Sequence, residues 1–425
     1  MKHTCSQVTL KNGLKGLVLQ APDTPVISME ISFRAGEFLL SREKWETAHL
    51  MEHLMLGANT NFKTARAFQA ELEKNGAYSN ASTSAYDVTY EIECARFEAE
   101  RVIGMLVSAL QAPVFKKSEF KAEFGNVKEE LVGRSNNHFR TLNLGLREAL
   151  GLYCVSDSDR VTLMKNVTSQ DVYDHYKATH SLQNARFIIA GDISPDMLVV
   201  LEKLHFDTSQ KRIGMPSETP KKLAGPIIIK KLNVPNYYFY VDCYASGLLS
   251  LKQRDALAVA STLLTETLHS KLLGAARSSG LVYAMGSGQQ HLKHISSFWL
   301  GAQVGKQNAD ALFDLTATVL KNIKKTGVTA KELSAAKQYM LGKHERSAQT
   351  VSGTISRYSS DYYHDDAIVA DDKYQERLNS ITNQDIINAL SAVFSGDKWA
   401  LGLLGNVPSS HAKKLYKKLL PIFAS

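Results

Sequence analysis

The sequence predicts an α+β protein built from two related halves. Three observations lead to this class. Strand-like and helix-like segments occur in separate groups, which favours α+β over a strictly alternating fold. Two segments recur at a fixed spacing. The chain has 425 residues, longer than a single hydrophobic core usually serves, so two domains are expected.

The internal repeat is visible in the sequence itself. Residues 168–172 (TSQDV) recur 214 positions later as residues 382–386 (TNQDI). At the same spacing, residues 187–194 (FIIAGDIS) match residues 401–408 (LGLLGNVP), and a glycine ends the apolar run in both copies. Two degenerate copies of one unit therefore fill the chain.

The boundary between the copies is expected where proline, glycine and charge cluster, between Gly214 and Pro226. We therefore expect a first domain at residues 1–215, a linker at residues 216–225 and a second domain at residues 226–425.

Local patterns assign the elements of the first half. Alternating apolar residues predict a strand at residues 26–33, and β-branched and aromatic residues predict two short strands within residues 79–93. Helix-forming composition and apolar spacing predict helices at residues 42–56, 64–74, 98–112 and 117–134.

The helix expected at residues 42–56 carries the most informative motif, His49-Leu50-Met51-Glu52-His53. Histidines four positions apart lie on one face of a helix and make a good pair of zinc ligands. The Glu52 carboxylate reaches the same place, where it could take a proton from a metal-bound water. The alternative is an amphipathic helix with two histidines on its polar face.

A third ligand is expected from the helix at residues 117–134. Glu123 and Glu130 are seven positions apart and share a face, whereas Glu129 points about 100° away from Glu130. One carboxylate could bind the metal while the other hydrogen-bonds to a ligating histidine. The alternative is a solvated acidic face.

Together these residues resemble the insulinase/pitrilysin family of zinc peptidases, also called inverzincins. The inverted motif HxxEH is followed by Glu130, 77 residues after His53, and Glu123 lies seven positions before Glu130. Further similar landmarks cover most of the chain: an opening strand at residues 12–14 (NGL), a segment with an edge strand at residues 76–90, and a second-domain tyrosine motif at residues 280–283 (GLVY).

The resemblance implies antiparallel sheets with helices packed mainly on one face. It implies one zinc ion per chain, held by His49, His53 and Glu130, with a fourth position for water. In this arrangement Glu52 is the general base, and Glu123 orients a ligating histidine from behind.

The resemblance also implies the residues that contact the substrate. An extended peptide would pair with the edge-strand residues Asn80, Ala81, Ser82 and Thr83. Tyr283 would stabilise the oxyanion; the alternative for Tyr283 is a core aromatic beside a glycine turn. The family places an arginine at the position of Ala276, so either Arg277 serves in its place or this contact is lost.

The second copy lacks the metal motif. At a spacing of 210, the three motif residues correspond in order to Val259, Thr262 and Leu263. Metal chemistry is therefore expected in the first half only, while the second supplies substrate contacts. A further pair, His291 and His294, is interpreted as surface polar residues.

Composition excludes several classes. With 44% hydrophobic and 22% charged residues the chain is not disordered. The net charge of +8 is a mild bias, and no basic run interleaves with aromatics, so nucleic-acid binding is not expected. No stretch approaches membrane-spanning length, so no membrane association is expected.

The expected compartment is the cytoplasm. The first residues lack the apolar core of a signal peptide. The four cysteines are scattered, as free thiols in a reducing compartment would be, with disulfides the minor alternative.

These inferences predict a zinc metalloendopeptidase that cuts peptides or small unfolded proteins. Short members of the resembled family pair to enclose a chamber, so we expect a homodimer with peptide substrates. Two alternatives stay open: a non-catalytic scaffold or partner subunit of the same fold, and the catalytic half of a heterodimer.

Overall fold

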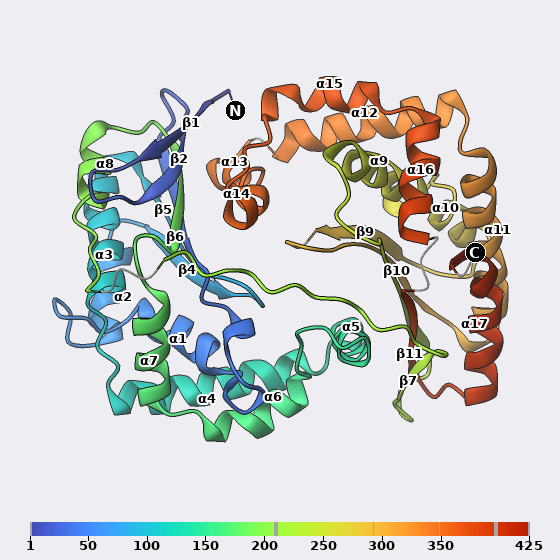
Figure 1. Cartoon of the computed structure of the whole chain (residues 1–425), viewed down its shortest axis with the longest axis horizontal. Helices are drawn as coiled ribbons and strands as arrows, with labels where there is room; N and C mark the ends of the chain where they lie inside the picture. Colours follow the sequence, from blue (N-terminus) through green and yellow to red (C-terminus); the bar gives the residue numbers. More distant parts are fainter. Residues whose placement is uncertain (1, 208–210, 292, 348, 395–397, 424–425) are drawn as a thin grey trace. The chain divides into compact units, whose positions relative to one another are not determined.

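The computed structural model describes residues 2–207, 211–291, 293–347, 349–394 and 398–423. Within these ranges the chain forms two compact units, each built around one β-sheet (Figure 1). Neither unit is one continuous stretch of sequence. The first comprises Met1–Gly133, Asp157–Met215 and Glu345–Val369; the second comprises Arg134–Ser156, Pro216–His344 and Ala370–Ser425.

The first unit contains a six-stranded sheet in the order β1-β2-β6-β3-β5-β4. All neighbouring strands are antiparallel except β2 and β6, which run parallel. β4 is an edge strand that pairs with β5. The strands are β1 (Thr4–Thr9), β2 (Lys15–Gln20), β3 (Val26–Phe33), β4 (Tyr78–Thr83), β5 (Val88–Ala95) and β6 (Ala185–Gly191).

Helices of the same unit pack on one face of this sheet. α3 shows the reason in its sequence, because Val102, Ile103, Leu106 and Leu110 recur at helical spacing and are all buried. The helices are α1 (Thr47–Met55), α2 (Ala65–Glu73), α3 (Ala99–Gln111), α4 (Lys117–Arg134), α6 (Asp157–Leu163), α7 (Ser169–Thr179) and α8 (Pro195–Leu201), with short 3₁₀ turns at Glu37–Leu39, Arg42–Lys44, Arg96–Glu98 and Met164–Asn166.

The second unit repeats the plan with a five-stranded sheet in the order β7-β11-β8-β10-β9. Only β7 and β11 run parallel among these pairs. Its strands are β7 (Ile227–Lys230), β8 (Tyr237–Tyr244), β9 (Met285–His291), β10 (Ser296–Val304) and β11 (Trp399–Gly405).

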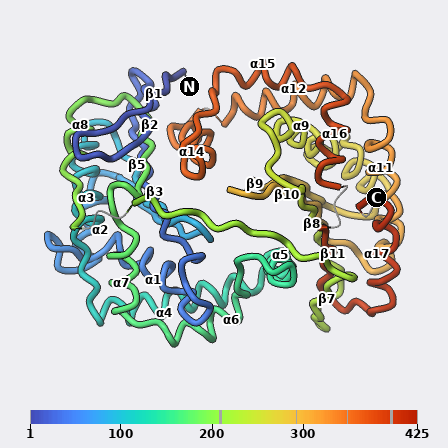
Figure 2. Tube along the Cα trace, in the orientation of Figure 1, coloured from blue at the N-terminus to red at the C-terminus, as the bar shows by residue number. Residues whose placement is uncertain are grey.

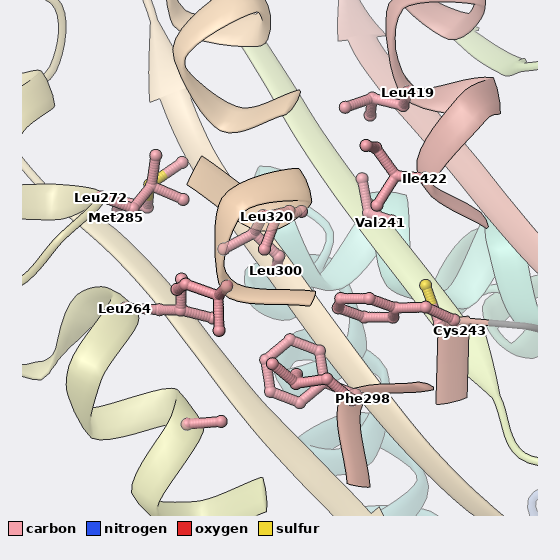
Figure 3. Packing of buried hydrophobic residues seen from close by; sticks show 14 of the residues in the cluster. Val241, Cys243, Leu264, Leu272, Met285, Phe298, Leu300, Leu320, Leu419 and Ile422 are labelled. Atoms are coloured by element: carbon pink, nitrogen blue, oxygen red, sulfur yellow. The ribbon is translucent and has the colours of Figure 1, made fainter. Parts of the chain in front are cut away.

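The large core of the second unit lies between this sheet and its helices. Figure 3 shows Phe298 and Leu300 of β10 packed in one cluster with Leu264, Leu320 and Ile422. The helical elements are α9 (Leu251–Ser261), a π-helical turn (Thr262–Glu266), α10 (Leu273–Ser278), a 3₁₀ turn (Lys306–Asn308), α11 (Ala309–Thr326), α12 (Ala330–Ser347), a 3₁₀ turn (Asp371–Lys373), α15 (Tyr374–Ser380), α16 (Asn383–Phe394) and α17 (Ser409–Phe423).

The other face of each sheet is covered by a segment from the opposite half of the sequence (Figure 2). In the first unit, α13 (Val351–Ile355), α14 (Ser359–Asp365) and the turn between them supply Val351, Ile355, Tyr358 and Tyr362, which pack on β2 and β6. In the second unit, α5 (His138–Ala149) supplies Leu142 and Leu146, which pack on β11. Because both faces are covered, β6 and β11 are buried at every position.

The structure confirms the internal repeat. β6 and β11 are equivalent residue for residue at the predicted spacing of 214. Each strand ends in a glycine with positive φ, 128° at Gly191 and 134° at Gly405. The segments TSQDV and TNQDI each start a helix, and Asp171 and Asp385 accept the backbone N–H of the preceding Thr168 and Thr382.

The predicted α+β class with two homologous units is confirmed, and the strand Val26–Phe33 and the helix Lys117–Arg134 have the predicted bounds. Two details differ. The helix expected at residues 42–56 is a 3₁₀ turn followed by α1. Each sheet has one parallel pair, β2 with β6 and β7 with β11, and three other strands separate the two members of each pair along the chain.

The expected domain ranges were contiguous, so they did not include the segments that each unit takes from the other half, residues 134–156 and 345–369. One change between the units falls between Met215 and Pro216, within the cluster of proline, glycine and charge. No helix in the described residues combines the length and the hydropathy that a membrane crossing requires.

The terminal glycines of the repeated strands give a testable prediction. Gly405→Ala should lower the free energy of unfolding by about 1–3 kcal/mol, because the new Cβ would lie 2.7 Å from the Asn236 carbonyl oxygen at a φ of 134°. The control Gly342→Ala, in open space on α12, should gain about 0.5–1 kcal/mol. Denaturant unfolding measures both, and equal stability of the two variants would contradict the prediction.

Candidate metal centre

α1 presents the two histidines of the motif side by side. Leu50, Met51 and Leu54 are buried in the core of the first unit and fix the rotation of the helix. The imidazole rings of His49 and His53 then lie with centroids 5.0 Å apart at 78° to each other. His49 is almost fully buried, and about a quarter of the His53 side chain is exposed.

Glu130 of α4 meets both rings at one point. Its Oε2 lies 3.3 Å from His49 Nε2 and 3.5 Å from His53 Nε2. With zinc–ligand distances near 2.0–2.1 Å, the ligand atoms of a tetrahedral site lie about 3.3–3.4 Å apart. The three side chains therefore have the donor atoms and the spacing that a tetrahedral zinc site requires.

Each histidine is held from behind by a second carboxylate. His53 Nδ1 lies 3.0 Å from Glu123 Oε2, and His49 Nδ1 lies 2.9 Å from Glu46 Oε2. The sequence predicted Glu123 for such a role but missed Glu46. A signal was present, because Glu46 lies three positions before His49 and so on the same side of the helix.

Glu46 belongs to a buried ion network. Arg160 of α6 donates to the Glu46 carboxylate from Nε and Nη2, and its Nη2 also lies 2.7 Å from Glu37. Burial raises the pKa of Glu37. Burial also acts to raise the pKa of Glu46, but hydrogen bonds from His49 and Arg160 outweigh it and lower that pKa. Glu46 therefore stays ionised inside the unit.

The carboxylates around His49 determine its charge. Burial lowers the pKa of His49, but hydrogen bonds to Glu130 and Glu46 outweigh burial and raise that pKa to about 9. The hydrogen bond to His53 lowers the pKa of Glu123. His49 Nε2 faces the Glu130 carboxylate, and a cation bound between them would take the place of any proton held there.

Glu52 completes the cluster. Ligand atoms of His49, Glu52 and His53 lie within 4.8 Å of one another. Across the described ranges, no hydrogen bond or ion pair engages the Glu52 carboxylate. Glu52 is therefore placed beside the two imidazoles while its carboxylate remains available as a base.

The edge strand β4 lies next to this helix. Thr83 Oγ1 is 3.5 Å from the Ala48 carbonyl oxygen on α1, directly before His49. Exposed and half-buried positions alternate along β4, and its residues Asn80, Ala81, Ser82 and Thr83 pair with β5. The predicted substrate-binding strand thus packs against the helix that carries the two predicted metal-binding histidines.

Tyr283 lies in the second unit and is not a core residue. Its side chain is 81% exposed, which excludes the alternative of a buried aromatic. Arg277 stacks on the Tyr283 ring, 4.5 Å from its centroid, and its Nη1 donates to the Tyr283 carbonyl oxygen at 2.8 Å. Ala276 is buried in α10, so position 277, and not 276, brings a guanidinium to Tyr283.

Tyr283 also borders a cavity of about 390 Å³ within the second unit. The cavity is lined by residues 280–286 and 301–303, together with Phe139, Asn236 and Gly305. His291 ends β9 and bonds to Ser296, and His294 follows in a bend.

The second unit lacks the metal motif at the equivalent place. Val259 is buried within α9, and Thr262 and Leu263 belong to the π-helical turn that follows it. None of the four cysteines, which all lie in the described ranges, forms a disulfide, and Cys94 and Cys243 are buried.

Comparison with known proteins gives two family matches. Residues 17–149 match the family described as "Insulinase (Peptidase family M16)". Residues 166–340 match the description "Peptidase M16 inactive domain". The chain belongs to the insulinase family of peptidases, family M16.

Individual M16 proteins resemble this chain along different parts of its length. The zinc protease PqqE of Helicobacter pylori is 25% identical over 422 residues, covering 92% of this chain and 90% of that protein. The β subunit of human mitochondrial-processing peptidase is 24% identical, over 49% of this chain and 47% of its own. A crystal structure of a protease from Helicobacter pylori superposes with a TM-score of 0.83 and 22% sequence identity, covering 95% of this chain and 100% of that one. This likeness shows that the two chains share a fold.

Proposed function

We propose that this M16 protein is a zinc-dependent endopeptidase that hydrolyses peptides or small unfolded proteins. The observation that carries the proposal is the convergence of His49 Nε2 and His53 Nε2 on one oxygen of Glu130. Glu52 lies in the same cluster, and the edge strand β4 contacts the same helix. This set provides a metal site, a base and a strand for peptide binding.

His49, His53 and Glu130 would hold one zinc ion per chain. The chemistry that zinc supplies at such a site is Lewis acidity, which lowers the pKa of a bound water. Glu123 keeps the His53 ring oriented through its hydrogen bond to Nδ1.

The chain's own residues would do the remaining work. The free Glu52 carboxylate takes a proton from the attacking water and returns it to the departing amine nitrogen. Residues 80–83 of β4 bind an extended peptide by adding it to the sheet, a mode that gives affinity with little sequence preference. Tyr283 donates a hydrogen bond to the developing oxyanion, and Arg277 grips the bound peptide.

The proposal predicts separate effects for a ligand and for the base. His53→Ala should abolish zinc binding, because two protein ligands rarely retain the metal. Glu52→Gln should keep one zinc per chain but lose about a hundred- to ten-thousandfold in peptidase activity, the usual contribution of a general base. Elemental analysis measures the zinc content of each variant. Digestion of a mixed peptide library, with and without chelator, measures the peptidase activity.

The exposed histidine His205 of the same unit is the matched control, and His205→Ala should change neither. Full zinc occupancy in His53→Ala would place the site elsewhere. Near-normal turnover by zinc-loaded Glu52→Gln would remove Glu52 from the mechanism.

A second candidate function is a non-catalytic partner subunit. The match of residues 166–340 to an inactive M16 domain favours a chain without catalysis, and the likeness to one subunit of a processing peptidase favours assembly with another chain. The complete set of His49, Glu52, His53 and Glu130 favours the enzyme. A zinc-loaded chain without activity in every peptide pool would favour the partner role.

Assembly gives the next prediction. One unit carries the proposed metal ligands and the other carries Tyr283. The chain has the length of the short family members, which pair to enclose a chamber. We therefore expect a dimer whose chamber excludes folded substrates. Light scattering should give twice the mass of 47.0 kDa. A fully active monomer at the same concentration would contradict the dimer, and activity that appears only after a second protein is added would identify the heterodimer.

Tyr283 gives the last prediction for this function. Because an oxyanion donor acts in the transition state, Tyr283→Phe should lower kcat and kcat/KM together by about a hundred- to a thousandfold, with KM nearly unchanged. The ring is retained and exposed, so stability should not change. Arg277→Ala should instead raise KM. Unchanged kcat in Tyr283→Phe would remove the hydroxyl from catalysis.

A further inference from the structure

We propose that Glu46, locked by Arg160, is the positioning residue that makes His49 a zinc ligand. The inference rests on the proposed zinc site and adds a residue that lies outside the HxxEH motif. It concerns the side of the imidazole that faces away from the metal.

The geometry at His49 selects one ring nitrogen as the ligand. A neutral imidazole has one N–H and one free lone pair, and the partner of one nitrogen decides the state of the other. At 2.9 Å from Glu46 Oε2, His49 Nδ1 donates its proton to the carboxylate. The lone pair is then on Nε2, which faces Glu130. Without Glu46 the ring could rotate or take up the other tautomer.

Burial makes this partner rigid. The Glu46 side chain has no exposed surface, and only 7% of the Arg160 side chain is exposed. An unpaired carboxylate in such a place would be costly, so the Arg160 guanidinium keeps it ionised and fixes its orientation. Glu123, the corresponding partner of His53, is a quarter exposed, so the His49 side is the more firmly held of the two.

Arg160 is in turn held by a second carboxylate. Its Nη2 lies 2.7 Å from Glu37 Oε1. The Glu37 backbone N–H donates to the Ser84 carbonyl oxygen at 3.3 Å, just after β4 ends. The chain of contacts therefore runs from the end of the edge strand through Glu37, Arg160 and Glu46 to the buried histidine.

The test is the zinc affinity of Glu46→Gln, measured by competition with a chromophoric chelator. Loss of a carboxylate behind a ligating histidine typically weakens metal binding about 10- to 100-fold, and we expect a loss in that range. The visible spectrum of the Co²⁺-substituted protein should also change, because it reports the geometry of the ligands.

Glu98→Gln is the matched control. Glu98 is also buried in the same unit and pairs with Arg101 at 2.5 Å, but it holds no histidine of the motif. It should lower thermal stability and leave zinc affinity unchanged. Equal zinc affinities of Glu46→Gln and the wild-type chain would overturn the inference while the proposed function stands. A wild-type chain that binds no zinc would overturn both.

A triple variant separates positioning from folding. Glu37→Gln is included because Arg160→Met would otherwise leave the buried Glu37 carboxylate without its cation. If Glu46 only neutralises Arg160, then Glu37→Gln, Glu46→Gln and Arg160→Met together should restore both stability and zinc affinity. If Glu46 positions His49, the triple variant should regain stability but stay weak in zinc binding. This comparison decides the matter even if Glu46→Gln alone fails to fold, and wild-type affinity in the triple variant would refute the inference.

Discussion

Burial of both sheet faces is the constraint on which the rest of this protein depends. β6 and β11 are buried at every position, so each needs cover on both faces. One side is served by helices of the same half, and the other by α13 and α14 or by α5 from the opposite half. The sheet so fixed supports the rigid packing of α1, and through it the direction of His49 and His53.

The candidate metal centre combines buried and exposed parts. His49 is backed by a carboxylate and a guanidinium that are both buried, whereas His53, Glu123 and Glu130 are partly exposed. The surroundings therefore hold His49 more firmly than the other three side chains. Glu52 lies on the same helix as His49. The edge strand β4 packs against that helix.

The sequence predicted those features that follow from local spacing. Two spacings are those of a helix face: four positions within HLMEH on α1, and seven positions within α4. The third spacing, 214 positions, is the length of the internal repeat, and it relates β6 to β11. The ion pair of Glu46 with Arg160 joins residues 114 positions apart, and no period marks it. The exchange of α5 and of α13 with α14 was also out of reach, because an apolar helix face does not reveal which sheet it will cover.

The exchange of covering segments has a consequence for the order in which the protein can form. While the chain is being synthesised, the first sheet has all its strands once residue 191 has emerged, but its second face stays bare until residues 345–369 follow. A ribosome adds about 5–20 residues per second, so this apolar face waits for several seconds at least. The first unit therefore cannot mature as an independent early domain, and a cut between the repeats would leave both products with an exposed sheet.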